Sequence, residues 1–339
     1  MSMRWFVARR LLFAACGMPL FACDEPGSSA ASQRDADAMT AADTTSADMT
    51  RTDTGSPDAS RPDTSTPEDD ALFAVCDRWL ADRALSSEGT WTGGSTQECQ
   101  AGTYSRTGLE NTLVQVNLYR WLVGLPAVTL DSRKNAEAQA CAVTMHANRD
   151  IEHDLPDSWA CRTDEAIRAA GMSNLATLPA VGAVDLYMDD EGIASLGHRR
   201  WILSNSLGPI GVGSTNQYSC LHVIGGSGRA DARFVAWPPP GLVPMEALNP
   251  ASWADIDRAG WSIQSDSVDV NRAELITVTK DGVAVEVDTW DLGYGYGSAY
   301  GLGLMPKGFR TEVGSTYRVT IESSRFDVIT YEFTPVDCR

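Results

Sequence analysis

The number and placement of the cysteines constrain this 339-residue chain more than any other feature of its sequence. Two of the eight cysteines, Cys16 and Cys23, lie near the N-terminus, and the other six all follow residue 70. An even set of six is typical of three disulfides formed in an oxidising compartment. The cysteines therefore predict an exported protein whose folded part begins after residue 70.

Six cysteines can pair in 15 ways, and none of the six belongs to a C-x-x-C motif of the kind that binds zinc. Proximity along the chain favours two of the pairs, and the third follows by elimination. The predicted pairs are Cys76 with Cys99, Cys141 with Cys161, and Cys220 with Cys338.

Residues 1–22 have the pattern of a secretion signal. Three arginines precede an apolar run, at residues 11–22, that is short for a membrane-spanning helix. The run ends in Leu20-Phe21-Ala22-Cys23, which resembles a bacterial lipobox. Lipidation of Cys23 leaves the later cysteines as an even set, so the sequence predicts a lipid anchor in the cell envelope. An ordinary cleaved signal, which would release a secreted protein, is the alternative.

Residues 23–70 are predicted to be a disordered linker. Residues 24–70 hold 12 acidic residues and three arginines, a net charge of −9, which is half of the −18 carried by the whole chain. The stretch has almost no large apolar side chains to offset the entropy of ordering it. The remainder is also acidic and has no basic block, which argues against nucleic acid as a partner.

Apolar residues recur every three to four positions in the next part of the chain, which predicts helices. The first is expected at 110–122, followed by a stop signal at Gly124 and Pro126. Asp131 is a suitable N-cap for a second helix that ends near Arg149. Three more helices are expected at 164–170, 179–189 and 196–203.

The apolar period then changes to two, which predicts strands at 210–213, 218–224 and 233–237. A break at residues 238–241 marks the expected domain boundary. Beyond it, Lys280-Asp281-Gly282 predicts a hairpin between strands at 273–279 and 283–289, and two further strands are expected at 317–321 and 329–333. The predicted fold class is α+β. After the linker, the sequence predicts an extension with disulfides at 71–108, an α+β domain at 109–240 and an immunoglobulin-like β-sandwich at 241–339.

Residues 291–303 alternate glycine with tyrosine and small residues. Exposed tyrosine rings present flat apolar faces, so this segment is a candidate for stacking against a glycan. The alternative is a glycine-rich connection whose tyrosines fill the rim of the sandwich.

Two ordered motifs identify a family resemblance. The first motif is Asn117-Leu118-Tyr119-Arg120 with Gly124-Leu125-Pro126. The second is Gly197-His198-Arg199-Arg200-Trp201, followed by Ile210-Gly211-Val212-Gly213. This order resembles the CAP superfamily of cysteine-rich secretory, antigen and pathogenesis-related proteins. The resemblance covers residues 109–237 and implies a three-layer α-β-α sandwich.

The resemblance also implies a cleft that holds two histidines and, in many members, two acids. His198 matches the second histidine and His153 the first. Asp190 matches one acid, with Glu191 as the neighbouring candidate. Relatives have a glutamate where this chain has Ser173, and that difference removes one of the groups that a hydrolytic role would use.

Two imidazoles and a carboxylate can hold a divalent metal such as zinc with one position open to water. The metal hypothesis therefore names His153, His198 and Asp190 as ligands. Its alternative is that His198 is a structural histidine hydrogen-bonded to an acid. No H-E-x-x-H or G-x-S-x-G motif is present, which argues against a zincin protease and an α/β-hydrolase nucleophile.

Three functions follow as expectations. The leading one is a cell-surface binding module for a hydrophobic or polysaccharide ligand. The second is a metal-dependent hydrolase of envelope peptide or polysaccharide, with His153, His198, Asp190 and Glu191 as candidate catalytic residues. The third is adhesion or scaffolding through the C-terminal β-sandwich. Fold alone does not choose between them.

Overall fold

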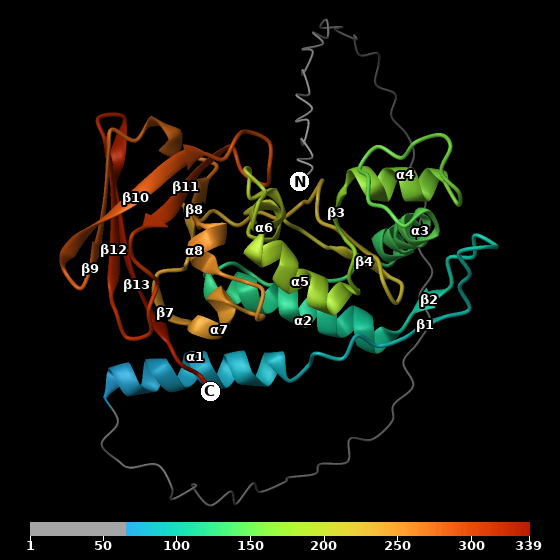
Figure 1. The fold of residues 1–339 in the computed structure, drawn as a ribbon, viewed down its shortest axis with the longest axis horizontal. Coiled ribbons are helices and arrows are strands. Elements are labelled where there is room, and N and C mark those ends of the chain that lie inside the picture. The colour runs from blue at the N-terminus through green and yellow to red at the C-terminus, as the bar shows by residue number, and fades with distance from the viewer. Residues whose placement is uncertain (1–65) are drawn as a thin grey trace, which may run out of the picture. The chain divides into compact units, whose positions relative to one another are not determined.

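The computed structural model describes residues 66–339, which belong to one compact unit, Arg61–Arg339 (Figure 1). The predicted signal peptide, Cys23 and nearly all of the predicted linker lie outside the described residues. Within residues 66–339, no helix combines the length and apolar character needed to cross a membrane.

The first helix, α1 (Pro67–Arg83), was not predicted, and its first four residues fall in the segment that was assigned to the linker. Thr66 and Asp69 form a reciprocal capping box at its start, and Pro67 occupies the first turn. Trp79 anchors the helix by packing edge-on against Tyr119, with ring centroids 6.1 Å apart. A short hairpin of β1 (Trp91–Thr92) and β2 (Thr103–Tyr104) follows.

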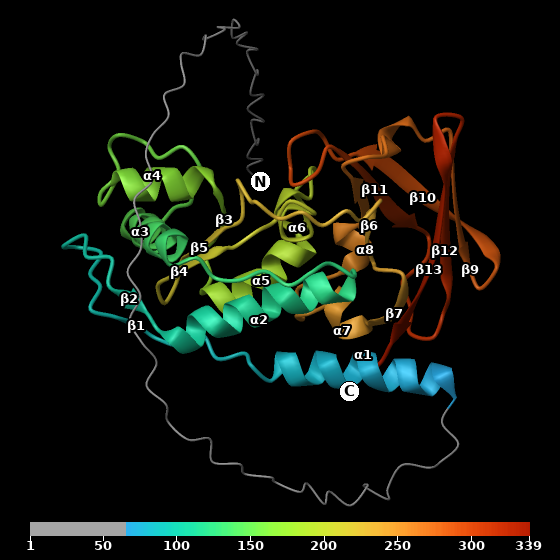
Figure 2. The same ribbon diagram turned by 180° about the vertical axis from the view of Figure 1, so that it is seen from behind.

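The next part of the chain forms three layers, with helices on both faces of a small sheet (Figures 1 and 2). The antiparallel sheet has the order β3-β5-β4. Its strands are β3 (Ser173–Ala176), β5 (Ser219–His222) and β4 (Gly211–Ser214). The helices are α3 (Ser132–Asn148) and α4 (Asp164–Gly171) on one face, α2 (Arg106–Leu122) and α5 (Ala180–Asp189) on the other, and the short α6 (Gly197–Ile202).

These helices confirm all five that the apolar spacing predicts. Asp131 accepts hydrogen bonds from the main chain of Arg133 and Lys134 and is the N-cap of α3, as expected. Helix α2 starts four residues earlier than predicted because Ser105 caps it by accepting from Gly108 N. Strand β3 was not predicted, since its four residues are buried throughout and do not alternate between apolar and polar.

Alternate residues of the sheet point into two separate apolar clusters. Leu175 and Cys220 pack with the small residues of α3 and α4, whereas Leu221 and Val212 pack with α2 and α5. Small side chains on α3 let it approach the sheet closely. A Cβ at Gly211 or Gly213 would overlap the main chain of α3, so this strand requires glycine at both positions.

Two residues of the first motif hold the layers together. The Asn117 amide donates to Val128 O (3.0 Å) and accepts from Val128 N (2.8 Å), which fixes the corner after α2. The fully buried Arg120 guanidinium donates to Ile202 O (2.8 Å) and Ser204 O (3.0 Å) at the end of α6. Burial lowers the pKa of Arg120 to about 10, which still leaves it charged at neutral pH.

The rest of the chain forms one eight-stranded sheet with the order β6-β8-β11-β10-β9-β12-β13-β7, antiparallel except for the parallel pair β13 and β7. Two short helices, α7 (Met245–Leu248) and α8 (Ile256–Ala259), connect β7 to β8. The strands in chain order are β6 (Val235–Trp237), β7 (Gly241–Pro244), β8 (Trp261–Ser265), β9 (Leu275–Lys280), β10 (Val283–Asp291), β11 (Tyr300–Lys307), β12 (Tyr317–Ser323) and β13 (Phe326–Val336).

This sheet curls so that distant strands face each other. Trp261 of β8 meets Phe333 of β13 edge-on at 4.9 Å, although four strands separate them in the sheet. Tyr317 completes the cluster. The predicted hairpin is present between β9 and β10, with Asp281 and Gly282 both at positive φ. The immunoglobulin-like arrangement itself stays a prediction.

The expected boundary at residues 238–241 is wrong, because β6 pairs with β8 in the curled sheet and not with β5. One continuous apolar core joins both parts, and Trp237 packs edge-on against Tyr119 of α2 at 5.5 Å. The two parts are therefore not independent folding units. A fragment of residues 241–339 would lack both an edge strand and part of its core.

A second connection, which we call the arginine interface, consists of Arg199 and Arg200 of α6 with the carbonyls they bind. Arg199 is fully buried and donates to Met188 O (2.7 Å), Asp189 O (2.6 Å) and Gly260 O (2.8 Å). Arg200 donates to Leu292 O and Gly293 O, beyond β10. Burial lowers the pKa of each arginine to about 10. Consecutive residues of one helix thus bind the end of α5, the start of β8 and the loop before β11.

The six cysteines form three disulfides, as their even number predicts, but all three predicted pairs are wrong. Cys76 of α1 reaches Cys338 near the C-terminus, across a separation of 262 residues. The helix α3 is joined to the sheet by a bridge from Cys141 to Cys220. Sequence proximity fails here because chain closure over long distances adds little entropic cost once tertiary packing brings the ends together. The third pair is Cys99 with Cys161.

Candidate functional site

The candidate site is built where α5 ends and α6 begins. Asp190 is the C-cap of α5 in the left-handed conformation (φ 56°), which turns the chain back toward α6. One oxygen of its carboxylate accepts from the main-chain N–H groups of His198 (3.0 Å) and Arg199 (3.2 Å). Asp190 is only 3% exposed, so the carboxylate is fixed within the protein.

His198 is oriented by the same carboxylate. Its Nδ1 lies 2.7 Å from the other oxygen of Asp190, and because a carboxylate accepts, Nδ1 is the donor. The ring also stacks on Tyr187, with centroids 5.5 Å apart. Nε2 makes no hydrogen bond to the described residues and remains as an acceptor. The alternative reading of His198, as a histidine hydrogen-bonded to an acid, is the one the structure shows.

His153 has the same arrangement from a different part of the chain. It follows α3, which ends with Arg149 in the left-handed conformation. Its Nδ1 donates to Ala170 O of α4 at 2.8 Å, so its Nε2 is again an acceptor, without a hydrogen-bond partner in the described part of the chain. His153 is therefore held by a main-chain carbonyl, whereas His198 is held by a carboxylate.

Both histidines line one pocket of about 380 Å³. The volume falls in the range typical of small-molecule sites, about 300–1,000 Å³. Polar side chains and aromatic or aliphatic side chains share its walls. The side chains that line it are His153, Ser173, Asn174, Ile193, Ser195, His198, Trp201, Ile224 and Tyr296.

Ser173 is the most informative polar residue in the pocket. Its side chain is 1% exposed, and its hydroxyl has no hydrogen-bond partner. Buried polar atoms are nearly always paired, and an unpaired one costs about 1–3 kcal/mol. The neighbouring Asn174, by contrast, donates to His198 O at 3.0 Å. Ser173 thus has hydrogen-bonding capacity that the protein itself does not use.

The predicted metal site does not have its third ligand. Asp190 directs its oxygens to His198 Nδ1 and to main-chain N–H groups, and it does not line the pocket. Across residues 66–339, the structure brings together no group of three or more His, Cys, Asp or Glu side chains that would hold a metal. Two imidazole nitrogens alone do not match the three protein ligands of a catalytic zinc site.

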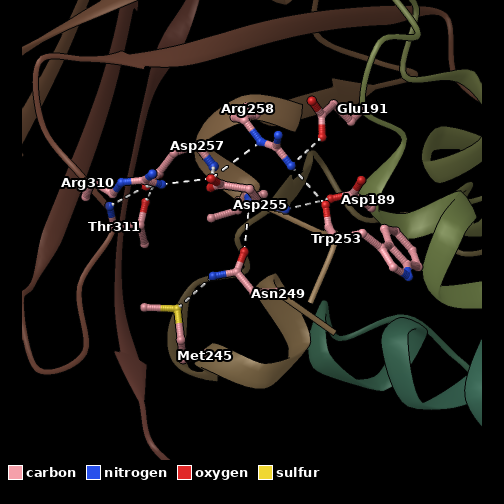
Figure 3. Close-up of polar contacts among 11 residues, drawn as sticks. Asp189, Glu191, Met245, Asn249, Trp253, Asp255, Asp257, Arg258, Arg310 and Thr311 are labelled. Carbon is pink, nitrogen blue, oxygen red and sulfur yellow. Dashed lines mark hydrogen bonds and ion pairs between the residues drawn. The ribbon is translucent and has the colours of Figure 1, made fainter. Parts of the chain in front are cut away.

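Glu191, the alternative acid, does not line the pocket. Its carboxylate pairs with Arg258 Nη2 of α8 at 3.0 Å, as Figure 3 shows. The adjacent Asp189 accepts from Asp255 N at 3.2 Å in the same group of contacts, and burial raises its pKa. This cluster is an ion-paired contact between α5 and α8. Glu191 therefore cannot supply the pocket with the base that Ser173 replaces.

Four side chains that line the pocket were not named from the sequence: Asn174, Ile193, Ser195 and Ile224. Trp201 was named only as part of the histidine motif, although its spacing of three residues from His198 on a helix was a usable signal that the two share a face. Tyr296 belongs to the segment noted for glycine and tyrosine, but nothing in the sequence placed it near His198.

Comparison with known proteins agrees with this geometry in one respect. Residues 113–224 match the model of the cysteine-rich secretory protein family, CAP. No curated protein matches the chain, and no solved structure does. The matched residues include both histidines, Asp190 and Ser173, and exclude Tyr296.

Proposed function

Residues 113–224 of this chain are a CAP domain, and from that premise we propose that the protein is an exported cell-envelope protein that binds a ligand in the pocket between His153 and His198. Three disulfides and the CAP family both fit an exported protein. Anchoring through a lipid on Cys23 is part of the proposal, and it rests on the sequence alone.

The observation that carries the proposal is the pattern of unused hydrogen-bonding atoms in the pocket. Among residues 66–339, the Nε2 atoms of His153 and His198 have no hydrogen-bond partner, although both histidines are held through Nδ1. A bound molecule with hydroxyl or amide groups would pair with these two nitrogens. Binding sites usually combine a few such polar groups with apolar walls, as Trp201 and Ile224 provide here.

The alternative of hydrolysis has one supporting observation. An imidazole held by a buried carboxylate is the arrangement used for general acid–base catalysis, and Asp190 holds His198 in that way. The metal-dependent form lacks a donor set in the described residues, so no step is derived through a metal. Adhesion through the curled sheet alone is less well supported, because that sheet shares its core with the CAP domain.

Calorimetric titration of the full chain tests the proposal with two kinds of probe. One is palmitate, and the other is a set of soluble tetrasaccharides of glucose, mannose and N-acetylglucosamine. We expect one kind to bind and the double variant His153→Ala/His198→Ala to bind it at least ten-fold more weakly, a loss of about 1.4 kcal/mol. His146→Ala is the matched control, because His146 stacks on Tyr218 away from the pocket. Absence of binding to every probe, or equal affinity for the double variant, would overturn the proposal.

A further inference from the structure

One wall of the CAP pocket comes from outside the CAP domain. The segment of residues 292–299 connects β10 to β11 of the curled sheet, and its Gly295 and Tyr296 line the pocket together with His198 and Trp201. About 70 residues of sequence lie between the end of the family match and this segment. The pocket is therefore incomplete without the C-terminal sheet.

Arg200 holds this segment in place. Its guanidinium donates to Leu292 O (2.8 Å), Gly293 O (3.0 Å) and Ser298 Oγ (3.0 Å), at both ends of the segment. Gly297 lies at positive φ, and a Cβ there would overlap the main chain of Arg200. The main chain of the segment is thus held against α6 on both sides of Tyr296.

Tyr296 fills part of the pocket and leaves part of its ring uncovered. The ring lies against Gly197, where any Cβ would come within 2.8 Å of Cδ1, and the Arg200 guanidinium lies 5.8 Å from its centroid. Even so, 43% of Tyr296 remains exposed. A half-covered ring that is supported from behind offers a flat, rigid surface at little entropic cost.

We propose that the ligand of this pocket is a saccharide, and that one sugar ring stacks on Tyr296 while its hydroxyl groups bind the Nε2 atoms of His153 and His198. This inference rests on the proposed function and narrows it to one ligand class. A pyranose has an apolar C–H face and a rim of hydroxyls, which matches an aromatic wall opposite unpaired polar atoms. An acyl chain would cover the two imidazole nitrogens without pairing with them, whereas sugar hydroxyls would donate to both.

The same segment supplies a matched control. Tyr294 lies two residues from Tyr296 and is 82% exposed, and it borders a different groove with Asp291 and Tyr300. Tyr294→Ala and Tyr296→Ala each remove one tyrosine ring from the same segment. Only Tyr296 lines the pocket, so the proposal predicts that only Tyr296 matters for binding in it.

The test is calorimetric titration of the full chain with the three tetrasaccharides. We expect one of them to bind, Tyr296→Ala to weaken it at least ten-fold, Tyr296→Phe to stay within about three-fold of wild type, and Tyr294→Ala to be unchanged. Thermal melts of all four proteins exclude unfolding as the cause. Wild-type affinity in Tyr296→Ala, or an equal loss in Tyr294→Ala, would overturn the inference.

Two outcomes distinguish the saccharide proposal from the more general proposal that the pocket binds a ligand. Binding of palmitate without any tetrasaccharide would leave the pocket as the binding site and remove the saccharide. A tetrasaccharide that depends on Tyr296 but binds equally well to the His153→Ala/His198→Ala variant would place the sugar on the loop and remove the pocket function.

Discussion

Helix α6 contributes residues to two regions, the arginine interface and the pocket, which differ in how their polar groups are paired. At the arginine interface, the guanidiniums of Arg199 and Arg200 are buried against main-chain carbonyls from distant segments. At the pocket, one residue earlier in the chain, His198 Nε2 makes no hydrogen bond to residues 66–339. The buried hydroxyl of Ser173 is also unpaired there. The interface pairs its guanidinium groups with main-chain carbonyls, although Arg200 Nε has no partner among residues 66–339, whereas the pocket leaves imidazole nitrogens available.

This difference separates groups that stabilise the fold from groups that are available to bind a ligand. A buried charge is tolerated when enough acceptors surround it, and those acceptors can then tie separate parts of a chain together. An unpaired buried polar atom such as the Ser173 hydroxyl costs stability, whereas the Nε2 atoms of His153 and His198 border an open pocket and are available to a ligand. Substitutions in the two regions should therefore change stability in opposite directions.

The largest effect is expected for Arg199→Met, which keeps much of the side-chain volume and removes the donors. Three main-chain carbonyls on α5 and before β8 lose a hydrogen bond in a buried site. We expect the free energy of unfolding to fall by about 3–5 kcal/mol, measured by urea denaturation. The exposed Arg325→Met is the control and should change it by less than about 0.5 kcal/mol. A loss under 1 kcal/mol for Arg199→Met would show that the interface does not depend on its charge.

An intermediate effect of opposite sign distinguishes two buried serines. Ser214 donates to Thr215 O (2.9 Å) and accepts from Ala180 N (3.1 Å), so Ser214→Ala should cost about 1–2 kcal/mol. Ser173→Ala removes an unpaired hydroxyl and should be neutral or stabilise the protein by up to about 1 kcal/mol. Thermal and urea denaturation of both variants provide the measurement. Equal destabilisation by the two substitutions would mean that Ser173 is paired in solution.

The smallest effect is a dependence of stability on pH that comes from His222. Burial, and then the charge of Lys134, lower the pKa of this imidazole below its ordinary value of 6.5, against the opposing charges of Glu137 and Asp131. The unfolded chain then binds more protons than the folded one, so stability falls as pH drops through about 6.5. We expect the melting temperature to fall between pH 7.5 and 5.5, and to fall less in His222→Gln. A steeper fall in His222→Gln would contradict a lowered pKa for His222. As a control, the two proteins should show the same change in melting temperature between pH 7.5 and 8.5, where this imidazole is neutral in both states.

Local sequence signals predicted the helices and part of the site. Apolar spacing and the Asp131 cap are properties of neighbouring residues, so they survive without knowledge of the rest of the fold. The family resemblance placed His153 and His198 together, and they do line one pocket. It did not reveal that Asp190 orients His198 from outside the pocket, because a motif fixes the position of a carboxylate in the chain and not the direction it faces.

Long-range pairings were predicted poorly. The order of the cysteines favoured neighbours, but α1 and the C-terminus pack together and join Cys76 to Cys338. The break at residues 238–241 was a sound turn signal, yet β6 before it pairs with β8 after it. Strand partners and disulfide partners are chosen by packing between distant segments, which local composition does not record.

By itself, the sequence determined five helices between residues 106 and 202, the hairpin of β9 and β10, the even set of cysteines and the two histidines of the CAP motif, since each is written in residue types at short spacing. Only the tertiary structure decided which cysteines pair, that one core spans both parts, and that Tyr296 reaches the pocket of His198. The physical reason is that these contacts depend on buried groups such as Arg200, whose partners lie about 90 residues away and are found only when the chain packs.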